Sequence, residues 1–185
     1  MKKQLLYCII LMALLASCAK EPIIYRLLPA EDAAAIPYHL GDTVKMSNEN
    51  NDTITFLVTY DTIEPLSEDD AQYYYADDSK MTYIPGPYCY GRAVQLRSYA
   101  NNTRMRFVVL PEKQFYFRWD YSFHISCQLN GETETININN VIYENVYLRQ
   151  EYDSETGDVL SQWYYNEEVG LIAVENKGHS LVRIP

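Results

Sequence analysis

The sequence predicts an all-β fold: an antiparallel meander of about ten strands, with no long helix in the domain. One observation is a run of 16 residues, 115–130, in which apolar and polar side chains alternate, as in a half-buried strand. The other is the regular recurrence of short turns rich in Asn and Gly between apolar runs. Evenly spaced hairpins favour antiparallel pairing over parallel crossovers. We expect a curved sheet, a half-barrel or a sandwich.

Length and charge narrow the class of protein. The chain has 185 residues, of which 48% are apolar, enough for one domain with a core of its own. Its formal net charge is -10, which argues against nucleic acid as a partner because phosphate binding needs clustered basic residues. Tyrosine is unusually frequent, at 18 residues.

The N-terminal segment has the pattern of an export signal. Lys2 and Lys3 precede a largely apolar stretch, Leu5 to Ala16, of 12 residues. A membrane-spanning helix needs about 20 apolar residues, so this stretch fits a secretory signal. It ends in Leu15-Ala16-Ser17-Cys18, which resembles the bacterial lipobox. The alternative is an ordinary signal peptide with a chance cysteine.

The lipobox resemblance implies a lipid anchor. It implies cleavage before Cys18, transfer of diacylglycerol to its thiol and acylation of the new amino group. Two or more acyl chains hold a protein stably on a membrane. We therefore expect a signal peptide over 1–17, a lipidated tether over 18–37 and one β domain over 38–185. The expected location is the cell envelope, at the outer membrane, with the face left open.

Two cysteines remain beyond the anchor, Cys89 and Cys127. An even pair in an oxidising compartment can form a disulfide. The alternative is two thiols in the interior of the domain. Cys127 falls on the apolar face of its predicted strand, whereas Cys89 is out of phase with the apolar residues that follow it.

The elements follow in order along the chain. Ala30 to Ala35, directly after Pro29, can form one or two helical turns. Residues 53–60 alternate as a strand, and Asn48 to Asn51 form the turn before it. Further strands are expected at 43–46, 92–99, 103–110, 133–138, 141–149, 159–165, 171–175 and 180–184.

The alternating run 115–130 is too long for an ordinary strand. At about 3.3 Å per residue it would extend roughly 50 Å. The strand is therefore either strongly curved or broken near Asp120. Asn130-Gly131 follows it and is a strong signal for a two-residue hairpin.

An irregular, acidic and tyrosine-rich insertion over 61–87 is the first candidate for a functional surface, since long loops often carry function. Exposed aromatic side chains can stack on sugar rings or peptides. The alternative is that tyrosine simply suits strands, with an apolar body and a polar tip. The candidate ligand-contact aromatics are Tyr73, Tyr74, Tyr75 and Tyr88.

Beyond the lipobox, residues 36–42, 140–146 and 163–172 resemble those of small Bacteroides-type envelope lipoproteins of uncharacterised function. The resemblance implies an antiparallel β domain at the cell envelope and brings no known activity. Three Asp-Thr-aliphatic tripeptides also match the O-glycosylation pattern of such proteins, although short tripeptides arise readily by chance. The acceptor residues would be Thr43, Thr53 and Thr62.

The motifs of common chemistries are missing from the sequence. It contains no Gly-x-Ser-x-Gly, His-Glu-x-x-His or phosphate-binding loop. His39, His124 and His179 are scattered, so we expect no metal and no other cofactor. The leading hypothesis is a non-enzymatic lipoprotein that binds a protein or a glycan. One alternative is a carrier that encloses a hydrophobic ligand in a half-barrel. Another is a glycan hydrolase, which would need two converging carboxylates.

Overall fold

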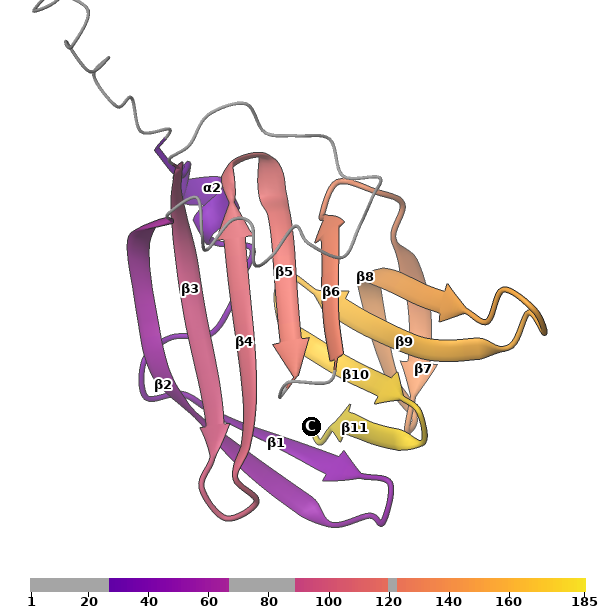
Figure 1. The fold of residues 1–185 in the computed structure, drawn as a ribbon. Coiled ribbons are helices and arrows are strands. Elements are labelled where there is room, and N and C mark those ends of the chain that lie inside the picture. The colour runs from indigo at the N-terminus through magenta and orange to yellow at the C-terminus, as the bar shows by residue number, and fades with distance from the viewer. Residues whose placement is uncertain (1–26, 67–88, 120–122) are drawn as a thin grey trace, which may run out of the picture.

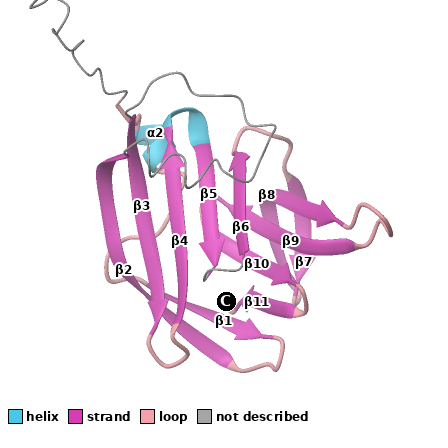
Figure 2. Cartoon of the chain, in the orientation of Figure 1, coloured by secondary structure: helices cyan, strands magenta, loops and turns pink. Residues whose placement is uncertain are grey.

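The computed structural model describes residues 27–66, 89–119 and 123–185. These residues form one antiparallel sheet of eleven strands, curled into a half-barrel (Figure 1). Strands dominate the described residues, and the helical segments among them are a few residues long (Figure 2). The predicted all-β, antiparallel class is confirmed, with eleven strands where about ten were expected. The strands are β1 (Thr43–Asn48), β2 (Thr53–Leu66), β3 (Cys89–Ser98), β4 (Thr103–Leu110), β5 (Gln114–Trp119), β6 (Phe123–Gln128), β7 (Glu134–Ile138), β8 (Val141–Tyr152), β9 (Val159–Asn166), β10 (Gly170–Asn176) and β11 (His179–Arg183).

The strand order is that of two meanders joined side by side. It runs β6-β5-β4-β3-β2-β1-β11-β10-β9-β8-β7, so β1 pairs with β11 and the two meanders meet there. The strands β6 and β7 lie at opposite ends of this order, although only residues 129–133 connect them. The sheet must therefore curl to bring its two edges near each other. The predicted hairpin at Asn130-Gly131 is wrong, because these residues cross between edges instead of joining paired strands.

The alternating run 115–130 was expected to be either one strongly curved strand or a strand broken near Asp120. The structure has the second arrangement, a hairpin of β5 and β6. Strand β5 ends at Trp119, β6 begins at Phe123, and these two residues are partners in the register. Three residues lie between them, so odd positions pair with odd positions across the turn. The inward face therefore stays on the odd residues throughout. This parity explains why the sequence alternates through the turn almost without interruption.

Aromatic side chains fill the concave face of the half-barrel. The rings of Trp163 and Tyr165 are stacked with centroids 5.1 Å apart, and Phe115 lies 4.6 Å from Tyr165. Phe107 and Phe117 complete the cluster, and all five side chains are at most 1% exposed. These rings come from β4, β5 and β9, so the core ties the two meanders together.

The N-terminal segment belongs to the domain. One or two helical turns were expected over Ala30 to Ala35, and helix α2 (Ala30–Ala33) forms one turn there, directly after Pro29. The two residues Ala35 and Ile36 are fully buried in the core, and Tyr165 donates a hydrogen bond of 2.7 Å to the carbonyl of Ala35. The expected tether over 18–37 is therefore wrong at its end, since these residues supply core side chains.

One arginine fixes this segment to the sheet. Arg92 is 7% exposed and forms two hydrogen bonds to Asp61, of 2.8 and 3.0 Å. Its guanidinium also donates to the carbonyls of Ala33, Ile36 and Tyr38. The planar group has donors in a fixed fork, so it can serve all these acceptors at once. The chain from residue 33 to 38 is thereby held against β2 and β3.

The predicted irregular insertion over 61–87 is wrong for its first six residues. Strand β2 runs through Leu66, so residues 61–66 are paired with β3 and are not irregular. The acidic residues Asp61 and Glu64 there form ion pairs with Arg92 and Arg106. Residues 67–88, which include all four candidate tyrosines, lie outside the described residues.

Candidate binding site

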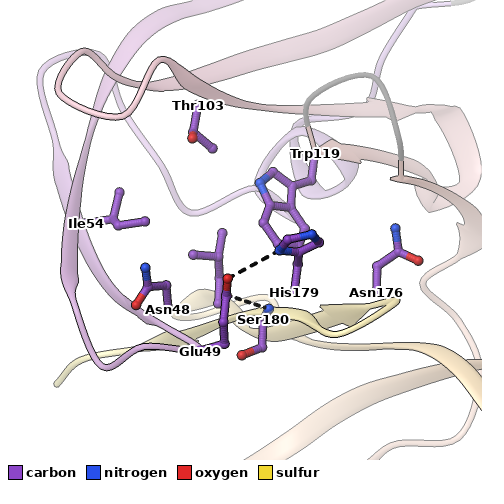
Figure 3. A pocket seen from close by; sticks show the side chains of 9 residues that line it. Asn48, Glu49, Ile54, Thr103, Trp119, Asn176, His179 and Ser180 are labelled. Atoms are coloured by element: carbon purple, nitrogen blue, oxygen red, sulfur yellow. Dashed lines mark hydrogen bonds and ion pairs between the residues drawn. The ribbon is translucent and has the colours of Figure 1, made fainter.

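A pocket of about 310 Å³ lies at one end of the half-barrel, where the β1–β2 and β10–β11 turns meet (Figure 3). Because β1 and β11 are antiparallel neighbours, with Asn48 opposite Leu181, their two turns share this end of the sheet. We call it the turn-end pocket. Its lining residues are Asn48, Glu49, Ile54, Thr103, Trp119, Asn176, His179, Ser180 and Leu181.

The β1–β2 turn is fixed by its own side chains. The Oδ1 atom of Asn48 accepts hydrogen bonds from the backbone N–H groups of Asn50, at 3.0 Å, and Asp52, at 2.8 Å. Asn51 has a φ of 63°, a left-handed conformation that asparagine tolerates well. This geometry places Glu49 at the tip of the turn, beside the neighbouring β10–β11 turn.

Glu49 links the two turns. Its Oε2 atom accepts a hydrogen bond of 3.2 Å from the backbone N–H of Ser180, and its Oε1 atom lies 3.3 Å from Nδ1 of His179 (Figure 3). Backbone N–H groups, first its own and then that of Ser180, together with the His179 ring, lower the pKa of this carboxyl. The pocket therefore presents a carboxylate with fixed orientation at neutral pH.

Trp119 supplies the aromatic wall of the pocket. It ends β5, its side chain is partly exposed, and it lines the pocket together with Thr103 and His179 (Figure 3). Its indole Nε1 is buried and has no hydrogen-bond partner. The buried side chains of Ile54 and Leu181 add apolar surface. The site thus combines one aromatic face with amide, hydroxyl, imidazole and carboxylate groups.

A second pocket, of about 490 Å³, lies beside the start of β1 and the β9–β10 turn. Its polar groups mostly serve the fold, since Asp42 accepts from the backbone N–H of His39 and Arg183 donates to the carbonyl of Val169. Its ring, Tyr38, is 3% exposed and accepts a hydrogen bond from the N–H of Leu171. Burial raises the pKa of Tyr38 to about 12. This pocket offers no exposed aromatic face from the described residues.

The hydrolase hypothesis needs two carboxylates that converge on one bond, and the ion-paired carboxylates of the described residues each lie against a basic side chain instead. Glu167 accepts two hydrogen bonds from Lys113 Nζ, at 2.8 and 2.7 Å, and one of 2.8 Å from Tyr147. The described residues contain no cluster of His, Cys, Asp or Glu that could hold a metal ion. These ion-paired carboxylates therefore give the hydrolase hypothesis no support.

The packing of the concave face weighs against a carrier. A carrier needs an open apolar cavity on that face, of several hundred Å³. The aromatic cluster around Phe115 and Trp163 occupies it instead. In the described ranges the two large pockets above lie at its margins and have mixed or polar linings.

The two cysteines are not joined in the structure. Strands β4 and β5 lie between β3, which begins with Cys89, and β6, which holds Cys127. Cys127 packs against the concave core, whereas Cys89 packs against a cluster on the opposite face of the sheet. A disulfide requires Cα atoms within about 7 Å and converging Cβ bonds. Of the two alternatives, the structure has the one without a disulfide, because the two side chains point to opposite faces of the sheet.

The three threonines of the predicted O-glycosylation pattern lie on strands. Thr43 begins β1 and Thr53 begins β2, and both are exposed, whereas Thr62, within β2, is partly exposed. Cys18, the predicted lipid attachment, lies outside the described residues. Within the part of the chain that the structure describes, no helix is long and apolar enough to cross a membrane.

Sequence reasoning missed the turn-end pocket. Trp119 stood out only as one residue of an alternating run, and His179 only as one of three scattered histidines. The pocket joins residues near positions 49, 119 and 179, which no local spacing connects. The one available signal was the two Asn-containing turns, and it does not reveal that the turns are neighbours.

Comparison with protein-family models, with curated proteins and with solved structures found no match. The chain is therefore classed by its fold alone, as an antiparallel β half-barrel. A fold does not imply a function, which depends on the chemistry of the site that the fold carries.

Proposed function

We propose that this chain is a membrane-anchored envelope lipoprotein whose β domain is a non-enzymatic binding module for a protein or a glycan. The observation that carries the binding role is the turn-end pocket, which Trp119 and Glu49 both line, at the end of a sheet with a filled interior. Binding sites combine apolar or aromatic surface with a few placed polar groups. The export signal and Leu15-Ala16-Ser17-Cys18 support anchoring at the outer membrane through N-terminal lipid.

The anchor is tested by replacing the acceptor thiol. Cells that express the chain are fed a fatty acid analogue, and the protein is assayed for label and for recovery with outer membranes. We expect labelling of the wild-type protein and none of Cys18→Ala, since the thiol is the predicted acceptor. Ser17→Ala is the matched control, because alanine is also small, and it should remain labelled. Equal labelling of Cys18→Ala would refute the anchor.

Binding is separated from hydrolysis in a second experiment. The purified full chain is screened against immobilised glycans and envelope proteins, and any glycan retained is incubated with the protein and assayed for new reducing ends. A binding module retains its partner unchanged. Release of new reducing ends at a rate proportional to protein concentration would contradict the non-enzymatic assignment.

A further inference from the structure

We propose that the turn-end pocket binds a neutral saccharide of one or two rings, with Trp119 as the stacking platform and Glu49 and Asn176 as partners for its hydroxyl groups. This inference rests on the proposed binding function and names its ligand class. The geometry, charge and size of the pocket each contribute to the assignment.

The volume limits the ligand to a small one. Pockets for small ligands have volumes of about 300–1,000 Å³, and the turn-end pocket, at about 310 Å³, lies at the lower end of that range. Such a site accommodates one or two sugar rings at the end of a longer glycan. It is too small to enclose a folded partner.

The aromatic wall suits the face of a sugar ring. The C–H groups on one face of a pyranose form an apolar surface that packs on an aromatic ring, and tryptophan has the largest such face. Trp119 is partly exposed in the pocket. Its indole N–H has no hydrogen-bond partner, so a ligand that contacts the ring breaks no hydrogen bond there. The side chain also packs against the aromatic core, which holds the ring in place as a platform.

The polar groups suit adjacent hydroxyls. A sugar hydroxyl both donates and accepts, so it is matched by a carboxylate, which accepts, and by an amide, which does both. Glu49 is held by the N–H of Ser180, and Asn176 is partly exposed at the end of β10. Glu49 is already oriented in the free protein, so it loses less freedom on binding. A purely hydrophobic ligand would take water from both polar side chains without offering them a new hydrogen bond, which is unfavourable.

Charge selects a neutral ligand. Glu49 would repel an anionic sugar, and among the described residues that line the pocket the one basic side chain is His179, which already faces that carboxylate. A cationic sugar would meet one carboxylate that His179 and Ser180 partly satisfy. Neutral hexoses and their oligomers therefore fit better than uronic acids, sialic acids or amino sugars.

The test is a titration of the full chain, in detergent micelles, with neutral, anionic and amino oligosaccharides, followed by calorimetry and tryptophan fluorescence. We expect neutral oligosaccharides to bind best. We expect Trp119→Ala to weaken that binding at least tenfold, and Glu49→Gln and Asn176→Ala to weaken it severalfold. Tyr152→Ala is the matched control, because Tyr152 is 57% exposed at the end of β8 and does not line the pocket. It should bind as wild type.

The outcomes distinguish this inference from the proposed function. If a glycan binds and Trp119→Ala binds it equally well, the pocket assignment is overturned while the binding module stands. If neutral saccharides fail to bind at millimolar concentration, the ligand class is overturned, and the protein partner remains for the proposed function. Tighter binding of anionic sugars also overturns it. Thermal unfolding of each variant identifies misfolding, and Glu49→Gln, an exposed substitution, keeps the test decisive if Trp119→Ala does not fold.

Discussion

Replacement of Gly170 by alanine tests how closely the N-terminal segment packs on the second meander. Gly170 begins β10 with a φ of +85°, which alanine adopts at a cost. A Cβ atom built there would overlap the Tyr38 ring at Oη and Cζ. The ring cannot simply move away, since Tyr38 is 3% exposed and its Oη accepts the N–H of Leu171 at 2.7 Å.

Two effects add in this variant. A left-handed conformation costs a residue with a Cβ about 1–2 kcal/mol, and overpacking of a well-packed core costs about 1–3 kcal/mol. Gly170→Ala should therefore lower the free energy of unfolding by about 2–5 kcal/mol, a large share of the roughly 5–15 kcal/mol of a typical domain. The matched control is Gly178→Ala, at a φ of +84° with no atom within 4 Å of the added Cβ. It should cost only the backbone part, about 1–2 kcal/mol.

The assay is urea unfolding followed by the fluorescence of Trp163, which is 1% exposed beside Tyr165. In a Tyr38→Leu background, the extra cost of Gly170→Ala over Gly178→Ala should shrink, because the overlapping ring is gone. Equal costs of the two glycine substitutions in the wild-type background would refute the predicted close contact between Tyr38 and Gly170.

Three further predictions concern buried groups. Arg92→Ala should lower the free energy of unfolding by about 3–5 kcal/mol, since it leaves a half-buried carboxylate and three carbonyls without their donor. Arg106→Ala, whose ion pair with Glu64 is more exposed, should cost about 0–1 kcal/mol in the same urea titration. The hydrogen bonds from Arg92 lower the pKa of Asp61 in the folded protein. The ion pair therefore stabilises the fold fully above the pKa that Asp61 has in the unfolded chain, about 3.9, and this stabilisation is lost as the pH falls through the pKa of Asp61 in the folded protein. Unfolding measured from pH 6 downward should show a steeper loss below about pH 4 for wild type than for Asp61→Asn, and parallel curves would contradict this. Burial raises the pKa of Cys127 to about 12, and the side chain is partly buried against the core, so iodoacetamide at neutral pH should alkylate it without reductant much more slowly in the folded protein than in urea. Equal rates of alkylation of Cys127 in the two states, measured by mass spectrometry, would contradict this.

The meander could be predicted because each hairpin is encoded locally. Residues that tolerate positive φ occupy the turns, as at Asn51 and Asn102, and alternation marks the strands between them. The run 115–130 is a case in which alternation could not locate the end of a strand. Three residues separate the paired residues Trp119 and Phe123, so odd positions face inward in both strands and the pattern could not distinguish one curved strand from the β5–β6 hairpin.

The candidate site could not be predicted in the same way. The sequence drew attention to the tyrosines of 61–87, yet residues 61–66 continue β2 and the rest lie outside the described residues. The turn-end pocket depends on β1 pairing with β11, a contact between the two ends of the domain. Nothing in the local pattern of either strand identifies its partner.

The sequence by itself determined the class of fold and most strand boundaries, because these depend on side chains close together along the chain. Only the tertiary structure decided the curl of the sheet, the filling of its concave face and the separation of Cys89 from Cys127. Those features follow from pairing across the whole chain and from which face each side chain occupies. The same long-range pairing brings Glu49, Trp119 and His179 together at one pocket.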